Sequence, residues 1–124
     1  MSEQRILRIN TCPSLSGRTS ITYHVGYSEV NEVSFRIWAT SGKGVFSKEW
    51  VSAAAIDKVL RQHKLLAAPS LLPVFKVGRS VNTAGYLLAV LKEEGLVALP
   101  EDTAHKYVRR ASEKFTAEVA KLIE

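Results

Sequence analysis

Cysteine is almost absent from this 124-residue chain, which contains only Cys12. One thiol cannot form a disulfide within the chain, and it cannot build a thiolate metal site alone. Long apolar runs are also missing: no segment approaches the roughly 20 apolar residues that span a bilayer, and the first residues alternate between polar and apolar types. These absences predict a soluble protein of a reducing compartment, with the cytoplasm as its expected location and no membrane partner.

Acidic residues are scarce in the middle of the chain. Between Lys43 and Arg79 only Glu49 and Asp57 are acidic, whereas seven residues are basic, and the excess of five equals the net charge of the whole chain. A positive segment predicts a face that attracts phosphate by releasing its counterions. A solvated surface that keeps the protein soluble would have the same composition. The seven basic residues are Lys43, Lys48, Lys58, Arg61, Lys64, Lys76 and Arg79.

Enzyme and metal motifs are missing as well. The Gly-Lys pair of 41–44 lacks the glycine and the hydroxyl residue of a phosphate-binding loop, because Ile37 and Gly44 occupy those positions, so a hairpin turn is expected there. The histidines are far apart, and none has a second ligand at metal-binding spacing. Only a chance approach of Cys12 to His24 would create a nucleophile beside a base. The sequence therefore predicts a non-enzymatic protein with no catalytic residues, metal or cofactor; the histidines are His24, His63 and His105.

The first half of the chain has the period-two alternation of β-strands. Short strands are expected at 6–9, 19–27 and 32–40, the last two as a hairpin, followed by a turn at 40–44 and a short strand at Val45 and Phe46. On the third strand the alternation places Arg36 and Trp38 on the face opposite Phe35. The prediction is an N-terminal antiparallel sheet of three to four strands.

The second half has helical spacing. Ser52 is expected to cap a helix that begins at Ala53, and prolines limit 64–75 to turns or a short helix. A long helix over 80–94 should end at Gly95, and its interior Gly85 suggests close contact with a neighbouring element. Pro100 should begin a last helix. The apolar stripe of that helix is Ala104, Val108, Ala111, Phe115, Val119 and Leu122.

Strands followed by helices predict an α+β fold. We expect one compact domain over 1–124, mainly strands in 1–50 and mainly helices in 51–124, with about three helices on one face of the sheet. The apolar helix over 80–94 is expected to anchor the core, because a helix that is apolar nearly all round is normally buried.

The stretch 77–97 resembles the recognition-helix half of a winged helix-turn-helix domain, and the resemblance extends over 51–97. It implies DNA binding, with 53–62 and 68–76 as the two preceding helices. Of the positions that would face the major groove, only Asn82 and Tyr86 could contact a base edge, and the helix expected from Pro100 replaces the wing. The matching residues are Gly78, Ser80, Thr83, Ala84, Leu88, Leu91, Glu94, Gly95, Leu96 and Val97; the other groove positions are Val81, Gly85, Ala89 and Val90.

The whole chain also resembles small proteins encoded in bacterial genomes and prophages, a resemblance that implies no activity. Two functions therefore stay open. The first is a basic module that binds DNA or RNA, with phosphate contacts from Lys58, Arg61, Lys64, Lys76 and Arg79 and base contacts from Asn82 and Tyr86. The second is a protein-interaction or self-associating module that uses a sheet edge or the open sheet face near Arg36, Trp38 and Lys43.

Overall fold

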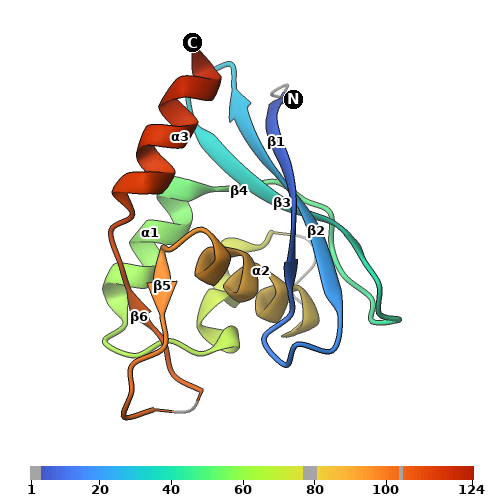
Figure 1. Cartoon of the computed structure of the whole chain (residues 1–124), viewed down its shortest axis with the longest axis vertical. Coiled ribbons are helices and arrows are strands. Elements are labelled where there is room, and N and C mark those ends of the chain that lie inside the picture. The colour runs from blue at the N-terminus through green and yellow to red at the C-terminus, as the bar shows by residue number, and fades with distance from the viewer. Residues whose placement is uncertain (1–3, 77–80, 104) are drawn as a thin grey trace.

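The N-terminal sheet of the computed structural model, which describes residues 4–76, 81–103 and 105–124, is antiparallel and has the strand order β1-β2-β3-β4 (Figure 1). Its strands are β1 (Gln4–Pro13), β2 (Ser20–Ser28), β3 (Val33–Thr40) and β4 (Val51–Ser52). The predicted antiparallel sheet is confirmed, but β1 is longer than expected. The strand predicted at Val45 and Phe46 is wrong: those residues are irregular, and Val51–Ser52 forms the fourth strand instead.

The period-two alternation separates the two faces of the sheet. Ile21, Tyr23 and Val25 of β2 and Phe35 and Ile37 of β3 are at most 2% exposed and form the floor of the core. The intervening residues of the same strands, which include His24, Arg36 and Trp38, lie on the opposite face. We call these the inner and the outer face.

Helices pack on the inner face, as predicted. The helix α1 (Ala53–Gln62) begins where the Ser52 hydroxyl accepts a hydrogen bond from the Ala55 amide at 3.1 Å. It is followed by the 3-10 helix η1 (Ala68–Val74), the helix α2 (Val81–Glu93) and the helix α3 (Glu113–Ile123). Gly95, at φ 80°, takes the left-handed conformation after α2.

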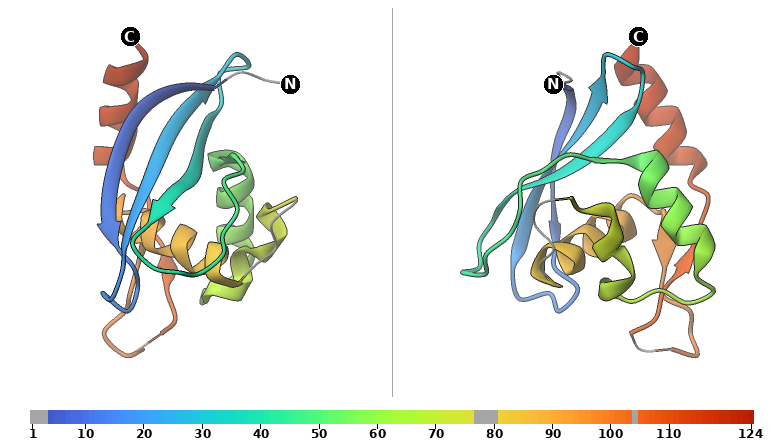
Figure 2. Two further views of the ribbon diagram at one scale, coloured as in Figure 1. Left: turned by 90° about the vertical axis from the view of Figure 1, so that its right-hand side faces the viewer. Right: turned by 180° about the vertical axis from the view of Figure 1, so that it is seen from behind.

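The apolar helix α2 anchors the core, in agreement with its composition. It contacts all three long strands and packs against η1 on its other side. The two views of Figure 2 show it across the lower half of the sheet, with α3 along the upper half. Its buried residues are Thr83, Ala84, Leu87, Leu88, Ala89, Val90 and Leu91.

The helix predicted from Pro100 is wrong at its start. Val97–Ala98 (β5) pairs antiparallel with Val108–Arg109 (β6), and the Tyr107 amide and carbonyl both bond to Leu66 at 2.7 Å. Tyr107 is buried, and aromatic and β-branched residues are both common in strands. Extended backbone is therefore favoured over a helical turn at Tyr107. The helix α3 begins only at Glu113, with Ser112 as its cap. Of the predicted stripe, Phe115 and Val119 are buried, Leu122 is exposed, and Ala104 lies outside the described residues.

Gly85 faces the neighbouring η1, as predicted, but the approach is not close enough to require a glycine. A Cβ built there would meet only the Ala68 Cβ, at the ordinary van der Waals distance of 3.9 Å.

In the part of the chain that the structure describes, no helix has the length and apolar character required to cross a membrane.

Candidate functional site

Two aromatic rings and two cations gather on the outer face of the sheet. Arg36 and Trp38 are two residues apart on β3, and the β2–β3 register places His24 opposite Arg36. Lys48 and Trp50 come from the irregular segment that leads into β4. We call His24, Arg36, Trp38, Lys48 and Trp50 the Trp–Arg cluster.

Arg36 is the centre of the Trp–Arg cluster. Its guanidinium carbon lies 4.7 Å from the ring centroid of Trp38 and 4.4 Å from that of Trp50. Its Nε donates a hydrogen bond to His24 Nδ1 at 3.0 Å. The His24 ring stacks on Trp38 with centroids 4.9 Å apart, and the Lys48 ammonium lies 4.5 Å from the Trp38 centroid. These distances are those of cation–π contacts, so the two indoles and the guanidinium hold one another in place.

The surroundings of His24 favour its neutral form. Burial, and secondarily the charge of Arg36, lower the pKa of His24, which leaves Nδ1 free to accept the hydrogen bond from Arg36. Burial also lowers the pKa of Arg36, although a guanidinium stays protonated in proteins. Within the described ranges, no carboxylate forms an ion pair with Arg36 or Lys48. The cluster therefore presents positive charge that no ion pair among the described residues neutralises.

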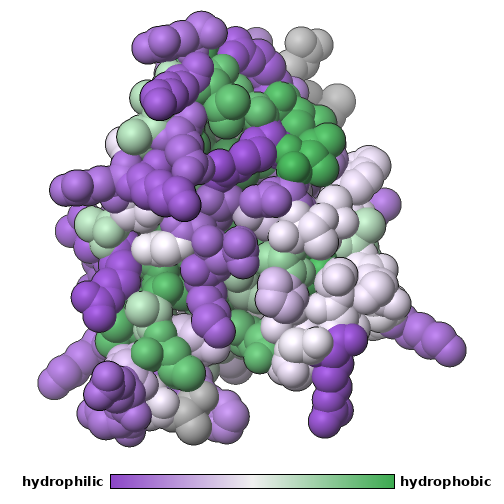
Figure 3. Space-filling model, viewed as in Figure 1, coloured by the Kyte–Doolittle hydropathy of each residue, from purple (hydrophilic) through white to green (hydrophobic). Residues whose placement is uncertain are grey.

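The accessible part of this face combines aromatic and aliphatic surface. Trp38 is 40% exposed, and Ile9, directly opposite His24 on β1, is 62% exposed. Ile6 is exposed as well, opposite Gly26. In the space-filling view, apolar surface gathers at the upper end of the sheet, whereas hydrophilic residues cover α3 (Figure 3).

The basic residues of the middle segment do not form one face. Lys76 lies beside the segment that carries Lys48, since the Lys76 backbone amide bonds to the Glu49 carboxylate at 2.9 Å, and Lys43 belongs to the β3–β4 loop. Lys58 and Arg61 lie on α1, which Figure 1 shows on the opposite side from the β3–β4 loop. Arg61 is paired with Asp57 at 2.6 Å. Lys64 is exposed just after α1, and the predicted phosphate contact Arg79 lies outside the described residues.

The predicted base contacts on α2 lie against other parts of the chain. Asn82 is exposed, but its side-chain amide donates to the Val45 carbonyl at 3.4 Å. Tyr86 is half-buried and packs edge-on against Phe46, with ring centroids 6.2 Å apart. Ala89 and Val90 are buried. The β3–β4 loop thus contacts both predicted base contacts, and only Val81 and Asn82 of the helix face that the winged-helix resemblance assigned to DNA are exposed.

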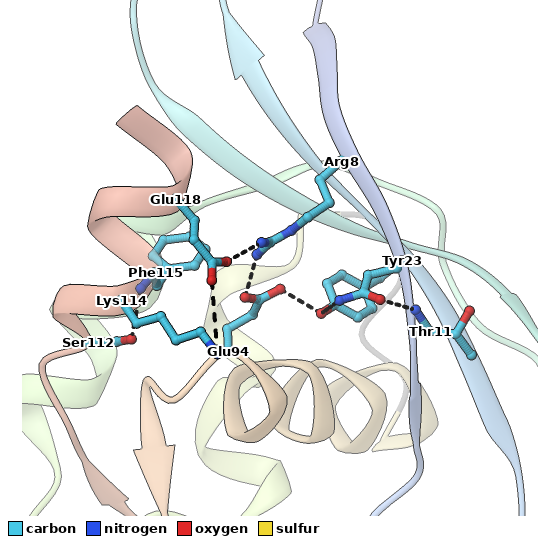
Figure 4. Close-up of polar contacts among 9 residues, drawn as sticks. Arg8, Thr11, Tyr23, Glu94, Ser112, Lys114, Phe115 and Glu118 are labelled. Carbon is cyan, nitrogen blue, oxygen red and sulfur yellow. Dashed lines mark hydrogen bonds and ion pairs between the residues drawn. The ribbon is translucent and has the colours of Figure 1, made fainter. Parts of the chain in front are cut away.

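A second group of polar side chains lies on the inner face, between β1, the end of α2 and α3 (Figure 4). Arg8 pairs with Glu94 and, at 2.6 Å, with Glu118, while the Tyr23 hydroxyl donates to Glu94 at 2.5 Å. Burial and the hydrogen bond to Glu94 raise the pKa of Tyr23. Each carboxylate here has a cationic or hydroxyl partner, which is typical of a hydrogen-bond network that stabilises the fold.

The nucleophile considered from the sequence does not form. Cys12 is buried on the inner face beside Ile21, whereas His24 lies on the outer face. Among the described residues, no group of three His, Cys, Asp or Glu side chains could hold a metal ion. Comparison with protein-family models, curated proteins and solved structures found no match for the chain.

The sequence indicates Arg36 and Trp38 but not the other three members of the cluster, His24, Lys48 and Trp50. In the sequence Lys48 is only one of seven basic residues of the middle segment, and no pattern places Trp50 on the sheet. The available signal was a second tryptophan two residues before the helix cap Ser52, at a point where the chain must return to the sheet.

Proposed function

We propose that this protein is a non-enzymatic nucleic-acid-binding module that binds single strands on the outer face of its sheet. The observation that carries the proposal is the Arg36 guanidinium placed at 4.7 and 4.4 Å from two indole rings, with Lys48 on the partly exposed one. Aromatic rings beside unpaired cations are the two elements that non-sequence-specific single-strand binding requires.

Each component has a separate physical role. A base can stack on the accessible surface of Trp38, which is worth about 1–3 kcal/mol per base and tolerates any sequence. The phosphates on either side of that base are attracted by Lys43, Lys48 and Lys76, whose side chains are exposed. Arg36 is held by His24 and Trp50, so it adds positive potential at a fixed place and loses little freedom on binding.

The tryptophans report directly on the proposed site, because the only two in the chain are Trp38 and Trp50. Titration with short oligothymidine at low salt is expected to quench their fluorescence. The affinity should decrease with salt with a log–log slope of about −2, as expected when about three phosphates are neutralised on a single strand. No quenching and no binding at low salt would contradict the proposal.

Paired variants separate stacking from charge and from folding. Trp38→Leu keeps an apolar cover on His24 and is expected to weaken binding about tenfold, whereas Trp38→Phe retains an aromatic ring and should bind nearly as well as the wild type. Lys48→Gln should weaken binding and flatten the salt slope by about 0.7. Lys121→Gln, on the exposed side of α3, is the control and should change the affinity only slightly.

We also propose that residues 51–110 form a winged-helix-like unit. The order of α1, an extended Leu66, η1, α2 and the β5–β6 pair supports it, as does the bridge between Leu66 and Tyr107. Because Tyr86 packs against Phe46 and both Ala89 and Val90 are buried, we assign nucleic acid to the Trp–Arg cluster and not to α2. Asn82→Ala should therefore leave the affinity for both duplex and single-stranded DNA unchanged; a large loss on duplex DNA would favour α2.

A second candidate function is protein interaction or self-association through the same face. Ile9 and Ile6 favour it, since two exposed aliphatic side chains lie on the edge strand β1 itself. If the face is a protein interface, sedimentation should show concentration-dependent association that Ile9→Lys and Trp38→Ala abolish. A monomer at high concentration would exclude self-association and leave the nucleic-acid proposal intact.

A further inference from the structure

A cavity of about 250 Å³ opens between α1, β3 and the start of α3, away from the outer face of the sheet. Its floor is formed by Phe35 and Phe115, which stack with ring centroids 5.6 Å apart. Ile56, Leu60 and Leu96 form apolar walls. Pockets for drug-sized molecules are usually larger, at roughly 300–1,000 Å³, so this cavity suits a smaller ligand.

The rim of the cavity is positively charged. Arg109 and Arg110 line it together with Asp57, whose carboxylate accepts from Arg109 Nε at 2.7 Å and from Arg61 Nε at 2.6 Å. The hydrogen bonds from Arg61 and Arg109 lower the pKa of Asp57, so it stays ionised. Two guanidinium groups, those of Arg61 and Arg109, thus neutralise one carboxylate, and Arg110 also lines the cavity. Within the described residues, no carboxylate pairs with Arg110.

We propose that this cavity is a binding site for a small aromatic carboxylate. The planar ring would enter between Ala53, Leu96 and the edge of Phe115, where burial of apolar surface contributes most of the affinity. The carboxylate would remain at the rim and pair with Arg110, a side chain whose fork of donors matches a carboxylate. Thr116 and Ala111, both exposed at the mouth, leave the entrance open.

Naphthoate is the probe for this site, and naphthalenemethanol, with the same ring system and no charge, is its matched control. Amide chemical-shift titration by NMR should show naphthoate-induced shifts concentrated on the residues that line the cavity. Naphthoate should bind about tenfold more tightly than naphthalenemethanol, since a charge-assisted hydrogen bond is roughly twice as strong as a neutral one.

Two variants test the two halves of the site. Arg110→Gln should lower the affinity for naphthoate about tenfold and leave that for naphthalenemethanol unchanged. Ala53→Leu, which adds volume at the wall, should weaken both probes. Lys64→Gln, an exposed cation that does not line the cavity, should change neither.

The spectrum of each variant without ligand shows whether it is folded, so loss of binding is not confused with loss of structure. The proposal is overturned if naphthoate binds no better than naphthalenemethanol, if the shifts fall elsewhere, or if folded Arg110→Gln binds naphthoate as the wild type does. Because the cavity and the Trp–Arg cluster share no residue, failure here would not affect the proposed nucleic-acid function.

Discussion

The indole of Trp50 lies so close to Gly26 that a Cβ built on Gly26 would be 2.6 Å from two of its ring carbons. Non-bonded carbon atoms do not approach to that distance. The absence of a side chain at Gly26 therefore allows Trp50 to lie against β2. There the Arg36 guanidinium carbon is 4.4 Å from the Trp50 ring centroid. Gly26 is thus a structural requirement of the Trp–Arg cluster, although it carries no functional group.

Gly26→Ala is expected to lower the free energy of unfolding by about 1–3 kcal/mol, the range for overpacking at a well-packed position. The ring of Trp50 must move to make room, so its fluorescence emission should shift in the folded variant. Urea denaturation gives the stability and the native baseline gives the emission. An alanine without effect on either would show that Trp50 is not packed on Gly26.

Gly85→Ala is the matched control and should have the opposite sign. Gly85 lies inside α2, its new Cβ would meet only the Ala68 Cβ at 3.9 Å, and alanine is favoured over glycine in a helix by roughly 0.5–1 kcal/mol. We expect stabilisation of about that size. Destabilisation would mean that α2 approaches η1 more closely than this distance.

The inner-face network predicts an asymmetric double-mutant cycle. Arg8→Met removes a cation from Glu94, whose side chain is only 7% exposed, and should cost about 3 kcal/mol because a largely buried carboxylate loses its charged partner. Glu94→Gln in the Arg8→Met background removes that charge and should restore part of the stability. Urea denaturation of the four proteins measures the coupling. If the effects of Arg8→Met and Glu94→Gln on the free energy of unfolding are additive, the two side chains behave as a solvent-exposed pair.

A neighbouring surface pair is the control for that cycle. Lys114 and Glu118 are 4.0 Å apart on α3, and Lys114 is 87% exposed. Exposed pairs of this kind contribute about 0–1 kcal/mol. Lys114→Gln should therefore change the free energy of unfolding far less than Arg8→Met.

The sequence was sufficient for the three long strands and for α1 and α2, because each has apolar residues at regular spacing, whereas the fourth strand was predicted at the wrong residues. Ile21, Tyr23 and Val25 are buried as their alternation predicts, and Ser52 caps α1 as its position predicts. The last helix was predicted too early because helical spacing from Val108 to Val119 fits a strand followed by a helix equally well. The long-range pairing of Tyr107 with Leu66 makes this segment extended, and no local sequence pattern contains that pairing.

The Trp–Arg cluster shows the same limit. Arg36 and Trp38 share a face by strict alternation, so their proximity was predictable. Trp50 belongs to a segment without periodicity, and its place over Gly26 depends on where an irregular ten-residue return to the sheet ends. Likewise, the basic residues belong to one segment of the sequence but lie on different sides of the molecule, because α1, which holds some of them, lies on the opposite side from the β3–β4 loop.

The lowered pKa of His24 predicts that stability decreases in mild acid. Burial, and then the charge of Arg36, favour neutral His24 in the folded protein, whereas unfolded histidine protonates near a pH of about 6.5. The unfolded state therefore binds more protons below that value. The free energy of unfolding should be constant above it and decrease as the pH falls from about 6.5 toward the lower folded-state pKa.

Urea denaturation at a series of pH values tests this, with His24→Gln as the key variant. Glutamine keeps an acceptor for Arg36 but does not titrate, so its curve should be flatter between about pH 5 and 7. His63→Gln, on an exposed residue, should retain the wild-type slope. Equal slopes for all three proteins would remove His24 as the source.

Cys12 is expected to be unreactive until the protein opens. Burial, with smaller effects from Glu93 and Glu94, raises the pKa of its thiol to about 11, so thiolate at about pH 8 is scarce as well as covered. Labelling with a disulfide reagent should be at least about 100-fold slower in the folded protein than in denaturing urea. Thr11→Cys in a Cys12→Ala background, one residue away on the exposed face, should react rapidly. Equal rates at the two positions would mean that β1 opens on the timescale of labelling.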